Sequence, residues 1–283
     1  MSLTTKKSKR EIYESYGILY DPENGKILSP EFGWISPVLI NGNTKLGRGV
    51  WTFSTLPSNR VFHIVISGKA YDIKGTCPCN CAGCYAQKGH YNGNDVKAAN
   101  ARKTFFAYYY LGWLKRAILA QIEADHIQLL RIHASGDFFS ADYIEMWREI
   151  VNRCPACVFW TYTKNPAAEK AFDDYSNINI VRSVIPGVGF NFGKCEYIIK
   201  AYHALTAAGK RVYICRCGMD KNQHCTNCRG CTENEFVLFV EHSTGYNAKK
   251  RSRFPGIVRV NRGAGKIICL SVFYQSLLLS FFS

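Results

Sequence analysis

The chain has 283 residues, of which 36 are Lys or Arg and 21 are Asp or Glu, so its formal net charge is +15 at pH 7. Hydrophobic residues make up 47% and aromatic residues 14% of the chain, a composition that excludes a disordered or fibrous protein and suits a sizeable core. The positive charge predicts attraction to polyanions such as nucleic acid, without sequence specificity.

Residues 1–60 are expected to form an irregular N-terminal extension, because Gly and Pro recur along them. Residues 1–10 are polar and basic with no apolar stretch behind them, so no secretory signal is expected. We therefore predict a cytoplasmic protein whose 13 cysteines stay reduced. Their odd number and their bunching favour metal ligation over a disulfide framework.

Residues 61–214 are predicted to form a parallel α/β core. Runs rich in β-branched and aromatic residues predict strands, and capped runs rich in Ala, Leu and Lys predict the helices between them. The predicted strands are 61–67, 128–133, 158–163, 178–183 and 211–214, and the predicted helices are 95–124, 141–152, one that begins at 166, and 194–209. This alternation is typical of right-handed βαβ units. Because these strands are too few for a closed eight-stranded barrel, we predict a partial (β/α) barrel or open parallel sheet with a cysteine-rich C-terminal extension.

Residues suited to ligand binding follow the carboxyl ends of the predicted strands. They are residues 77–84, 135–137 and 163–165, Ser183, and Cys215 with Cys217. In parallel α/β folds, ligands bind at this edge of the sheet. At the same edge, His133 is compatible with a proton carrier or with a hydrogen-bonded core histidine.

Nine of the 13 cysteines fall in two short windows, and the first window holds Cys77, Cys79, Cys81 and Cys84. Cys77, Cys81 and Cys84 have the spacing C-x3-C-x2-C on a predicted loop. Three thiolates so placed can bind three irons of a four-iron cluster and leave the fourth iron open to a ligand. The alternative is a closed zinc or iron–sulfur site completed by an outside ligand. The spacing leaves the role of Cys79 undefined.

This spacing after a first strand resembles that of the radical S-adenosylmethionine (radical SAM) superfamily. The resemblance implies a partial (β/α) barrel, a [4Fe-4S] cluster and S-adenosylmethionine, whose reductive cleavage gives a 5′-deoxyadenosyl radical. It also implies that Ser135, Gly136 and Asp137 stand where the superfamily has a turn that binds the methionine amine. We assign these three residues and Ser183 to cofactor binding. Gly83 departs from the superfamily pattern, which has an aromatic residue just before the third cysteine.

A closer resemblance covers residues 61–241. Residues 131–140, 143–147 and 162–165 and the late cysteine cluster resemble the bacteriophage gene product 88-like family. That family has no firm activity to carry over. The resemblance implies a phage or prophage source, and hence the cytoplasm of a bacterial host, and it supports the fold more than the chemistry.

The second cysteine window lies in residues 215–235 and is predicted to bind a metal. Its candidate ligands are Cys215, Cys217, Cys225, Cys228 and Cys231. Four thiolates suffice for zinc or for a second iron–sulfur cluster, and their spacing does not decide between the two.

Residues 236–283 form a tail that is basic and then apolar. The basic part, which includes Lys249 and Arg251, is expected either to bind nucleic-acid backbone or to be a solvated face. The 17 residues 267–283 carry no charge and are at the lower limit for spanning a bilayer. Their Ser and Gln residues favour a buried terminal segment over a membrane anchor.

Two functions are compatible with these patterns. The first is a radical SAM-like iron–sulfur enzyme that requires an electron donor. The sequence identifies neither its catalytic residues nor its substrate, for which nucleic acid or another phage or host macromolecule are the candidates. The second is a non-catalytic, zinc- or iron–sulfur-stabilised phage protein that binds nucleic acid.

Overall fold

The structure is a computed structural model that describes residues 7–42, 46–66, 68–81, 84–87, 91, 93–185, 189–216 and 224–240. The chain divides into two compact units, residues 1–241 and 242–283. All described elements belong to the first unit. The basic and apolar parts of the tail lie outside the described residues, as do Gly83 and Cys217.

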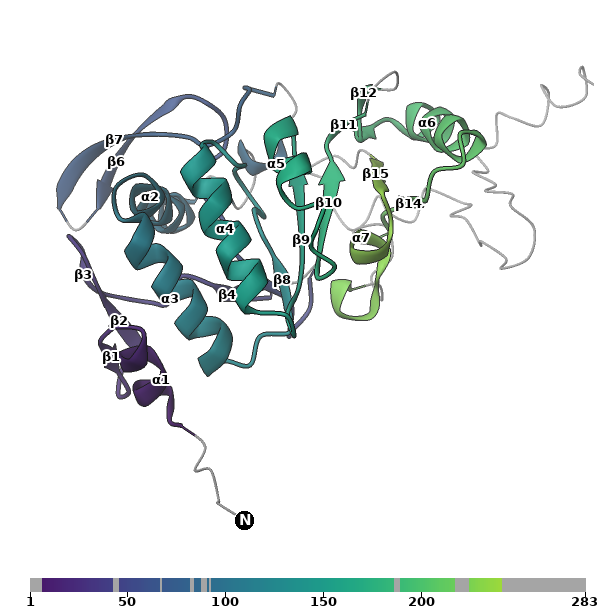
Figure 1. Ribbon diagram of the computed structural model, residues 1–283. Helices are drawn as coiled ribbons and strands as arrows, with labels where there is room; N and C mark the ends of the chain where they lie inside the picture. The colour runs from purple at the N-terminus through teal and green to yellow at the C-terminus, as the bar shows by residue number, and fades with distance from the viewer. Residues whose placement is uncertain are drawn as a thin grey trace, which may run out of the picture. The chain divides into compact units, whose positions relative to one another are not determined.

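A five-stranded sheet forms the framework of the first unit (Figure 1). Its strands lie in the order β10 (Ile178–Arg182), β9 (Val158–Thr163), β8 (Leu129–Arg131), β5 (Trp51–Thr52) and β4 (Ile40–Asn41). Strands β5, β8, β9 and β10 are parallel and neighbour one another in chain order, whereas β4 pairs antiparallel with β5. The predicted α/β fold with parallel strands is confirmed, and the described strands form no closed barrel.

Helices connect the parallel strands. They are α2 (Asn94–Tyr109) and α3 (Leu111–Ala124) between β5 and β8, α4 (Ala141–Arg153) between β8 and β9, and α5 (Pro166–Ala171) between β9 and β10. Ser140 caps α4, because its side chain accepts a hydrogen bond from the N–H of Tyr143 (3.2 Å). Asn165 caps α5, which begins at Pro166 as predicted.

The main core lies between this sheet and helices α3 and α4. Its largest fully buried side chains include Tyr143 and Trp147 of α4, Leu114 of α3, Phe53 just beyond β5 and Phe159 of β9. Burying one such side chain contributes roughly 1.5–3 kcal/mol. This core therefore holds the carboxyl ends of the parallel strands in fixed relative positions.

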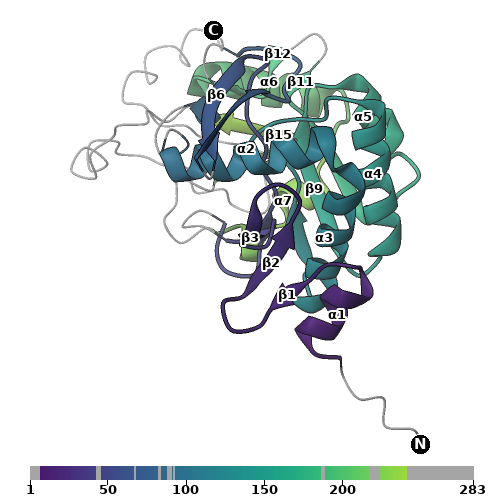
Figure 2. The same ribbon diagram turned by 90° about the vertical axis from the view of Figure 1, so that its left-hand side faces the viewer.

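Shorter elements come before and after the five-stranded sheet along the chain. Before it come α1 (Lys9–Ser15) and an antiparallel sheet of β1 (Tyr20–Asp21), β2 (Lys26–Ser29) and β3 (Gly33–Ile35). Helix α1 packs against α3 (Figure 2).

The elements after the five-stranded sheet form a second, smaller group. They are the pair β11 (Val184–Ile185) and β12 (Gly189–Phe190), helix α6 (Cys195–Ala207), and a parallel sheet in the order β13 (Phe192–Gly193), β15 (Phe236–Val240) and β14 (Val212–Ile214). Short helical turns lie at η1 (Tyr85–Gln87), η3 (Cys225–Asn227) and α7 (Gly230–Glu233).

Two predicted strands lie outside the five-stranded sheet: the strand at 211–214 is β14 of the separate parallel sheet, and the strand at 61–67 belongs to a hairpin. Strand β6 (Val61–Ile66) pairs antiparallel with β7 (Lys69–Lys74), and the hairpin lies between β5 and the first cysteine group. Side chains on one face of β6 pack towards the core, while Val61 and Val65 are 52% and 65% exposed. The strand predicted at 61–67 is therefore present, but its placement in the parallel core is wrong, because an apolar run looks the same in a hairpin covered on one face. The first parallel strand is β5, whose two residues are too few to show a pattern.

The single helix predicted at 95–124 is two helices. Helices α2 and α3 meet at Tyr110, whose backbone (φ −135°, ψ 45°) is not helical. The Tyr110 hydroxyl donates to Glu31 (2.9 Å) and its ring packs on Phe106. These tertiary contacts accompany the break in an otherwise helical pattern. Helix α2 begins at Asn94, with Gly93 at the N-cap position, so Asp95 lies in its first turn.

Lys103 of α2 is a buried cation that forms no ion pair in the described part of the chain. Its ammonium lies 5.7 Å from the centroid of the Phe53 ring. Burial, with the charge of Arg102, lowers the pKa of Lys103 from 10.5 to about 7. Because the unfolded chain binds this proton more tightly than the folded state does, stability is lost at pH 7 and below and is recovered as the pH rises towards 10.5.

Lys103→Met is expected to stabilise the fold at pH 7, by on the order of 3 kcal/mol, since it removes the buried charge. The free energy of unfolding of the unmodified protein should rise between about pH 7 and pH 10, and this rise should shrink in the variant. Urea unfolding at several pH values measures both effects, with the exposed Lys26→Met change as the control. A Lys103→Met variant with the original pH dependence would contradict this assignment.

Candidate functional site

The first cysteine group lies at the carboxyl edge of the parallel strands. After the β6–β7 hairpin the chain returns to this edge, where the N–H groups of Thr76 and Cys77 donate to the carbonyls of Leu56 and Ser58, both at 3.0 Å. Leu56 and Ser58 belong to the segment that follows β5. The hairpin is therefore an insertion, and the cysteine loop takes the position of a loop that follows the first parallel strand.

A buried hydrogen-bond network joins this loop to the segments after β5, β8 and β9. The hydroxyl oxygens of Thr55 and Thr76 are 2.8 Å apart, and the N–H of Asp137 donates to the Thr76 hydroxyl (3.0 Å). The Asp137 carboxylate accepts from the Thr163 hydroxyl (2.6 Å) and from the N–H of Lys164 (2.9 Å). The side chains of this network, which we call the Asp137 clasp, are shielded from water, since the four residues other than Lys164 are at most 1% exposed.

Gly136 allows the Asp137 clasp to close. Its φ of +89° lies in the left-handed region, which favours glycine. A Cβ at this position would overlap the hydroxyl of Thr55 and would lie 2.6 Å from that of Thr76. The glycine is therefore needed both for its backbone conformation and for the close approach of the two threonines.

Two of the predicted cofactor residues use their side chains to hold this edge together. The Ser135 hydroxyl donates to the carbonyl of Thr55 (3.0 Å), and the Asp137 carboxylate accepts a further hydrogen bond from the N–H of Phe138 (2.8 Å). Burial raises the pKa of Asp137, and its three donors partly offset that rise. Both side chains therefore already have protein partners.

Ser183 lies at the same edge, directly after β10. Its N–H donates to the carbonyl of Thr163 (2.8 Å) and its carbonyl accepts from the N–H of Asn191 (3.1 Å), and the residue is 7% exposed. The structure therefore places all the predicted cofactor residues at the carboxyl edge of the sheet. That they bind S-adenosylmethionine stays a prediction for Ser135, Gly136, Asp137 and Ser183.

The four thiols of the first group are half-buried and form no disulfide. The Sγ atoms of Cys79 and Cys81 are 3.3 Å apart, and the N–H of Cys84 donates to the carbonyl of Cys81 (3.2 Å). Burial, with the charge of Asp137, raises the pKa of Cys77 to about 12. Burial and the contact with Cys81 raise the pKa of Cys79 to about 11. Cys77 and Cys79 therefore hold their protons at neutral pH, and a metal that binds them must displace those protons.

Lys164 supplies positive charge at the cysteine loop. Burial lowers the pKa of Lys164, but the charges of Cys81, Asp137 and Cys77 outweigh burial, and the pKa is raised overall. The Lys164 ammonium therefore stays protonated beside the thiols, where it favours their thiolate forms.

Among the residues that the structure describes, no three His, Cys, Asp or Glu side chains are grouped so that they could hold a metal ion. Metal binding by either cysteine group therefore stays a prediction. In a four-iron cluster each thiolate binds a separate iron, so the ligands of such a cluster do not have to converge on one point.

Cysteines of the second group gather beside two tyrosines. The described members are Cys215, Cys225, Cys228 and Cys231. The Tyr162 hydroxyl donates to the Cys231 Sγ (2.7 Å), and the Tyr213 hydroxyl lies 3.2 Å from the Cys228 Sγ. A Cβ on Gly230 would overlap the Tyr213 ring, so the backbone of α7 packs directly against it. Cys215, Cys225 and Cys231 thus belong to the same small hydrophobic cluster as the two tyrosines, and Cys228 contacts Tyr213. Cys217 lies outside the described residues.

His133 is a core residue. It is 2% exposed, and its Nε2 lies 2.8 Å from the Tyr143 hydroxyl. Burial, with the charge of Arg131, lowers the pKa of His133 to about 3. The imidazole is therefore neutral at physiological pH, which supports the core role over that of a proton carrier.

Several residues that build the two sites cannot be recognised from the sequence. They are Thr55 and Thr76 of the Asp137 clasp, and Tyr162 and Tyr213 beside the second cysteine group. Thr and Tyr are common in ordinary strands, so these residue types do not indicate a functional site. The one usable hint is position, because Thr76 directly precedes the first cysteine of the motif.

A model of the gene product 88 family matches residues 37–254, more than two thirds of the chain. The chain belongs to the gene product 88 family. This confirms the resemblance to that bacteriophage family, and the matched region contains both cysteine groups and every strand of the parallel sheet. No curated protein and no solved structure matches the chain.

None of the described helices is both long enough and apolar enough to cross a membrane. Residues 267–283, for which a buried terminal segment was favoured over an anchor, lie outside the described part of this gene product 88 family member.

Gly136→Ala is expected to destabilise the protein by about 3 kcal/mol or more, because it combines backbone strain with a steric overlap. Gly17→Ala is a matched control, since Gly17 also has a positive φ (+69°) but has nothing within 4 Å of its Cβ position. Gly17→Ala should cost only about 1 kcal/mol, from backbone strain alone. Thermal or urea unfolding measures the difference, and equal losses in the two variants would contradict the close packing around Gly136.

Proposed function

We propose that this member of the gene product 88 family is a radical SAM-type iron–sulfur enzyme in which Cys77, Cys81 and Cys84 bind a four-iron cluster. The observation that carries the proposal is the position of the C-x3-C-x2-C loop at the carboxyl edge of parallel strands that neighbour one another in chain order. Parallel α/β folds bind their ligands at this edge. Strands β5, β8, β9 and β10 are then the first part of a partial (β/α) barrel.

The residues of the loop have the chemistry that such a cluster needs. Thiols are the usual protein ligands of iron–sulfur clusters, and the thiols of Cys77, Cys81 and Cys84 are not consumed by disulfides. A cluster held by three thiolates carries negative charge, which the neighbouring Lys164 ammonium offsets. The donor set therefore fits the group, although the described side chains are not grouped around a single ion.

Cys77, Cys81 and Cys84 would hold the four-iron cluster, and its open iron would supply the chemistry of reductive S-adenosylmethionine cleavage, in which one electron converts the sulfonium into methionine and a 5′-deoxyadenosyl radical. That electron must come from an external one-electron donor. The residues of the chain itself hold the cysteine loop in position, because the Asp137 clasp fixes this loop against the ends of β8 and β9. Because the side chains of Ser135 and Asp137 already have partners, we assign cofactor contacts at this turn to backbone groups. At Ser183, whose N–H and carbonyl are already paired, we assign the contact to the side-chain hydroxyl.

We also propose that Cys215, Cys217, Cys225, Cys228 and Cys231 provide the ligands of an auxiliary iron–sulfur cluster or a zinc ion. The hydroxyl of Tyr162 donates to the Cys231 sulfur. A hydrogen bond to a thiolate withdraws negative charge from it and tunes the metal that it binds. The two tyrosines are therefore suited to stabilising charged sulfur in a buried setting.

Anaerobic reconstitution with iron and sulfide tests the proposal. The protein should then bind a cluster at the first group, and dithionite with S-adenosylmethionine should release 5′-deoxyadenosine. Cys81→Ala should lose about four irons per chain and at least 90% of the release, because one thiolate of the motif is gone. Cys79→Ala, a change in the same loop outside the motif, is the matched control and should retain both.

Zinc alone after reconstitution would overturn the proposal and favour a metal-stabilised binding protein. Equal losses in Cys79→Ala and Cys81→Ala would contradict the assignment of the three ligands.

A further inference from the structure

Cys79 has no role in the proposed cluster site, although it lies inside the cysteine loop. It stands between Cys77 and Cys81 and is not one of the three motif cysteines. The Sγ atoms of Cys79 and Cys81 are only 3.3 Å apart, and both residues are half-buried, so they remain partly exposed to solvent. Cys79 therefore contacts a proposed iron ligand at a place that small solutes reach.

The short separation of these two sulfurs distinguishes a thiol pair from two ligands of one metal. Two thiolates on a tetrahedral zinc ion lie about 3.8 Å apart, because each Zn–S bond is about 2.3 Å long. Thiolates on separate irons of a cluster lie farther apart than that. A disulfide instead requires the two sulfurs to approach to about 2.05 Å, a movement that rotation of the two side chains supplies. The contact therefore suits bond formation between the sulfurs better than joint ligation of one ion.

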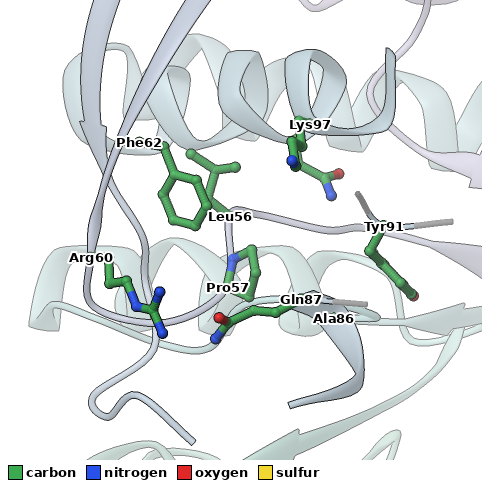
Figure 3. A pocket seen from close by; sticks show the side chains of 9 residues that line it. Leu56, Pro57, Arg60, Phe62, Ala86, Gln87, Tyr91 and Lys97 are labelled. Atoms are coloured by element: carbon green, nitrogen blue, oxygen red, sulfur yellow. The ribbon is translucent and has the colours of Figure 1, made fainter. Parts of the chain in front are cut away.

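Hydrogen bonds hold the turn that carries this pair. The Cys84 N–H donates to the carbonyl of Cys81 (3.2 Å). The side chain of Asn80, between the two cysteines of the pair, accepts a hydrogen bond from the Gln87 amide (3.3 Å). Gln87 in turn lines a pocket of about 250 Å³ together with Phe62 of the inserted hairpin (Figure 3). These contacts anchor the turn that keeps the two sulfurs adjacent.

We propose that Cys79 is a resolving thiol that protects Cys81 from irreversible oxidation by hydrogen peroxide whenever the cluster is absent. The site of modification is the sulfur pair itself, and the product is a Cys79–Cys81 disulfide. That the disulfide protects a cluster ligand rests on the proposed function, whereas its formation does not require a cluster.

The reaction proceeds in two steps. Hydrogen peroxide transfers one oxygen atom to the Cys81 sulfur, which becomes a sulfenic acid, and water leaves. The Cys79 sulfur then attacks the Cys81 sulfur, so that the S–S bond forms, the S–O bond breaks, and hydroxide leaves as water with the Cys79 proton. Overall, two thiols and one peroxide give one disulfide and two waters, and two electrons pass from the thiols to the peroxide. Because the sulfurs are in contact, the same disulfide forms if peroxide reaches Cys79 first.

The disulfide is a reversible stopping point. Without a neighbouring thiol, a sulfenic acid is oxidised further to a sulfinic acid, which ordinary thiols do not reduce. A disulfide between residues only two positions apart is strained and exposed, so a thiol reductant readily reopens it. Cys81 is then available to bind iron.

Peroxide treatment of the full-length, metal-free protein tests the inference. Peptide mass spectrometry, after alkylation of the remaining thiols, should find a Cys79–Cys81 disulfide that dithiothreitol removes. In Cys79→Ala, sulfinic acid at Cys81 should rise about tenfold, because the sulfenic acid has lost its resolving partner. Cys79→Ser, which keeps the size of the side chain, should behave in the same way. Cys84→Ala removes another thiol of the same loop, is the matched control and should keep the disulfide.

Two results would overturn the proposal. The first is a main disulfide that joins Cys81 to Cys77 or to Cys84 in the unmodified protein. The second is an amount of sulfinic acid at Cys81 that is the same in both Cys79 variants as in the unmodified protein.

Reconstitution with iron and sulfide, after peroxide and then dithiothreitol, separates this proposal from the proposed function. The unmodified protein should regain most of its cluster iron and its release of 5′-deoxyadenosine, whereas Cys79→Ala treated in the same way should regain several-fold less. A Cys79–Cys81 disulfide in a protein that binds no cluster even without peroxide treatment would remove the proposed function alone. Cluster binding and release in the untreated protein, with no such disulfide after peroxide, would remove the resolving role of Cys79 alone.

Discussion

The Asp137 carboxylate accepts hydrogen bonds from the Thr163 hydroxyl and the Lys164 N–H, and the N–H of Asp137 donates to Thr76. These contacts join the ends of β8 and β9 to the residue that precedes the cysteine loop. A buried carboxylate is stable only where its charge is compensated by such donors. The position of the cysteine loop therefore depends on Asp137, through its buried carboxyl group and its N–H, and Gly136 allows the chain to approach closely enough for these contacts.

Much of this edge was predictable from sequence, because parallel strands bring their carboxyl ends together whatever their loops contain. The strands at 128–133, 158–163 and 178–183 and the caps Ser140 and Asn165 have strong local signals, and the structure contains them. The role of Asp137 was not predictable. A carboxylate after a strand looks the same whether it faces a ligand or is buried under three protein donors, and only tertiary contacts separate the two.

The inserted hairpin shows why the first strand was misplaced. Residues 61–66 have the apolar run of a buried strand, whereas β5 has two residues and no visible pattern. Local sequence reports how well a segment fits a half-buried surface, not which strand it pairs with. The same insertion contributes to the pocket beside the cysteine loop, because Phe62 of the hairpin is one of its lining residues.

Strand β9 connects the two cysteine groups. Its last residues, Tyr162 and Thr163, point to opposite faces of the sheet, as successive strand residues do. Thr163 donates to Asp137 at the first group, and Tyr162 donates to Cys231 at the second. The pairing of β9 with both β8 and β10 makes it an interior strand of the sheet, which resists displacement. The spacing between the two cysteine groups is therefore set by adjacent residues of one rigid strand, and metals bound at both would keep a fixed separation.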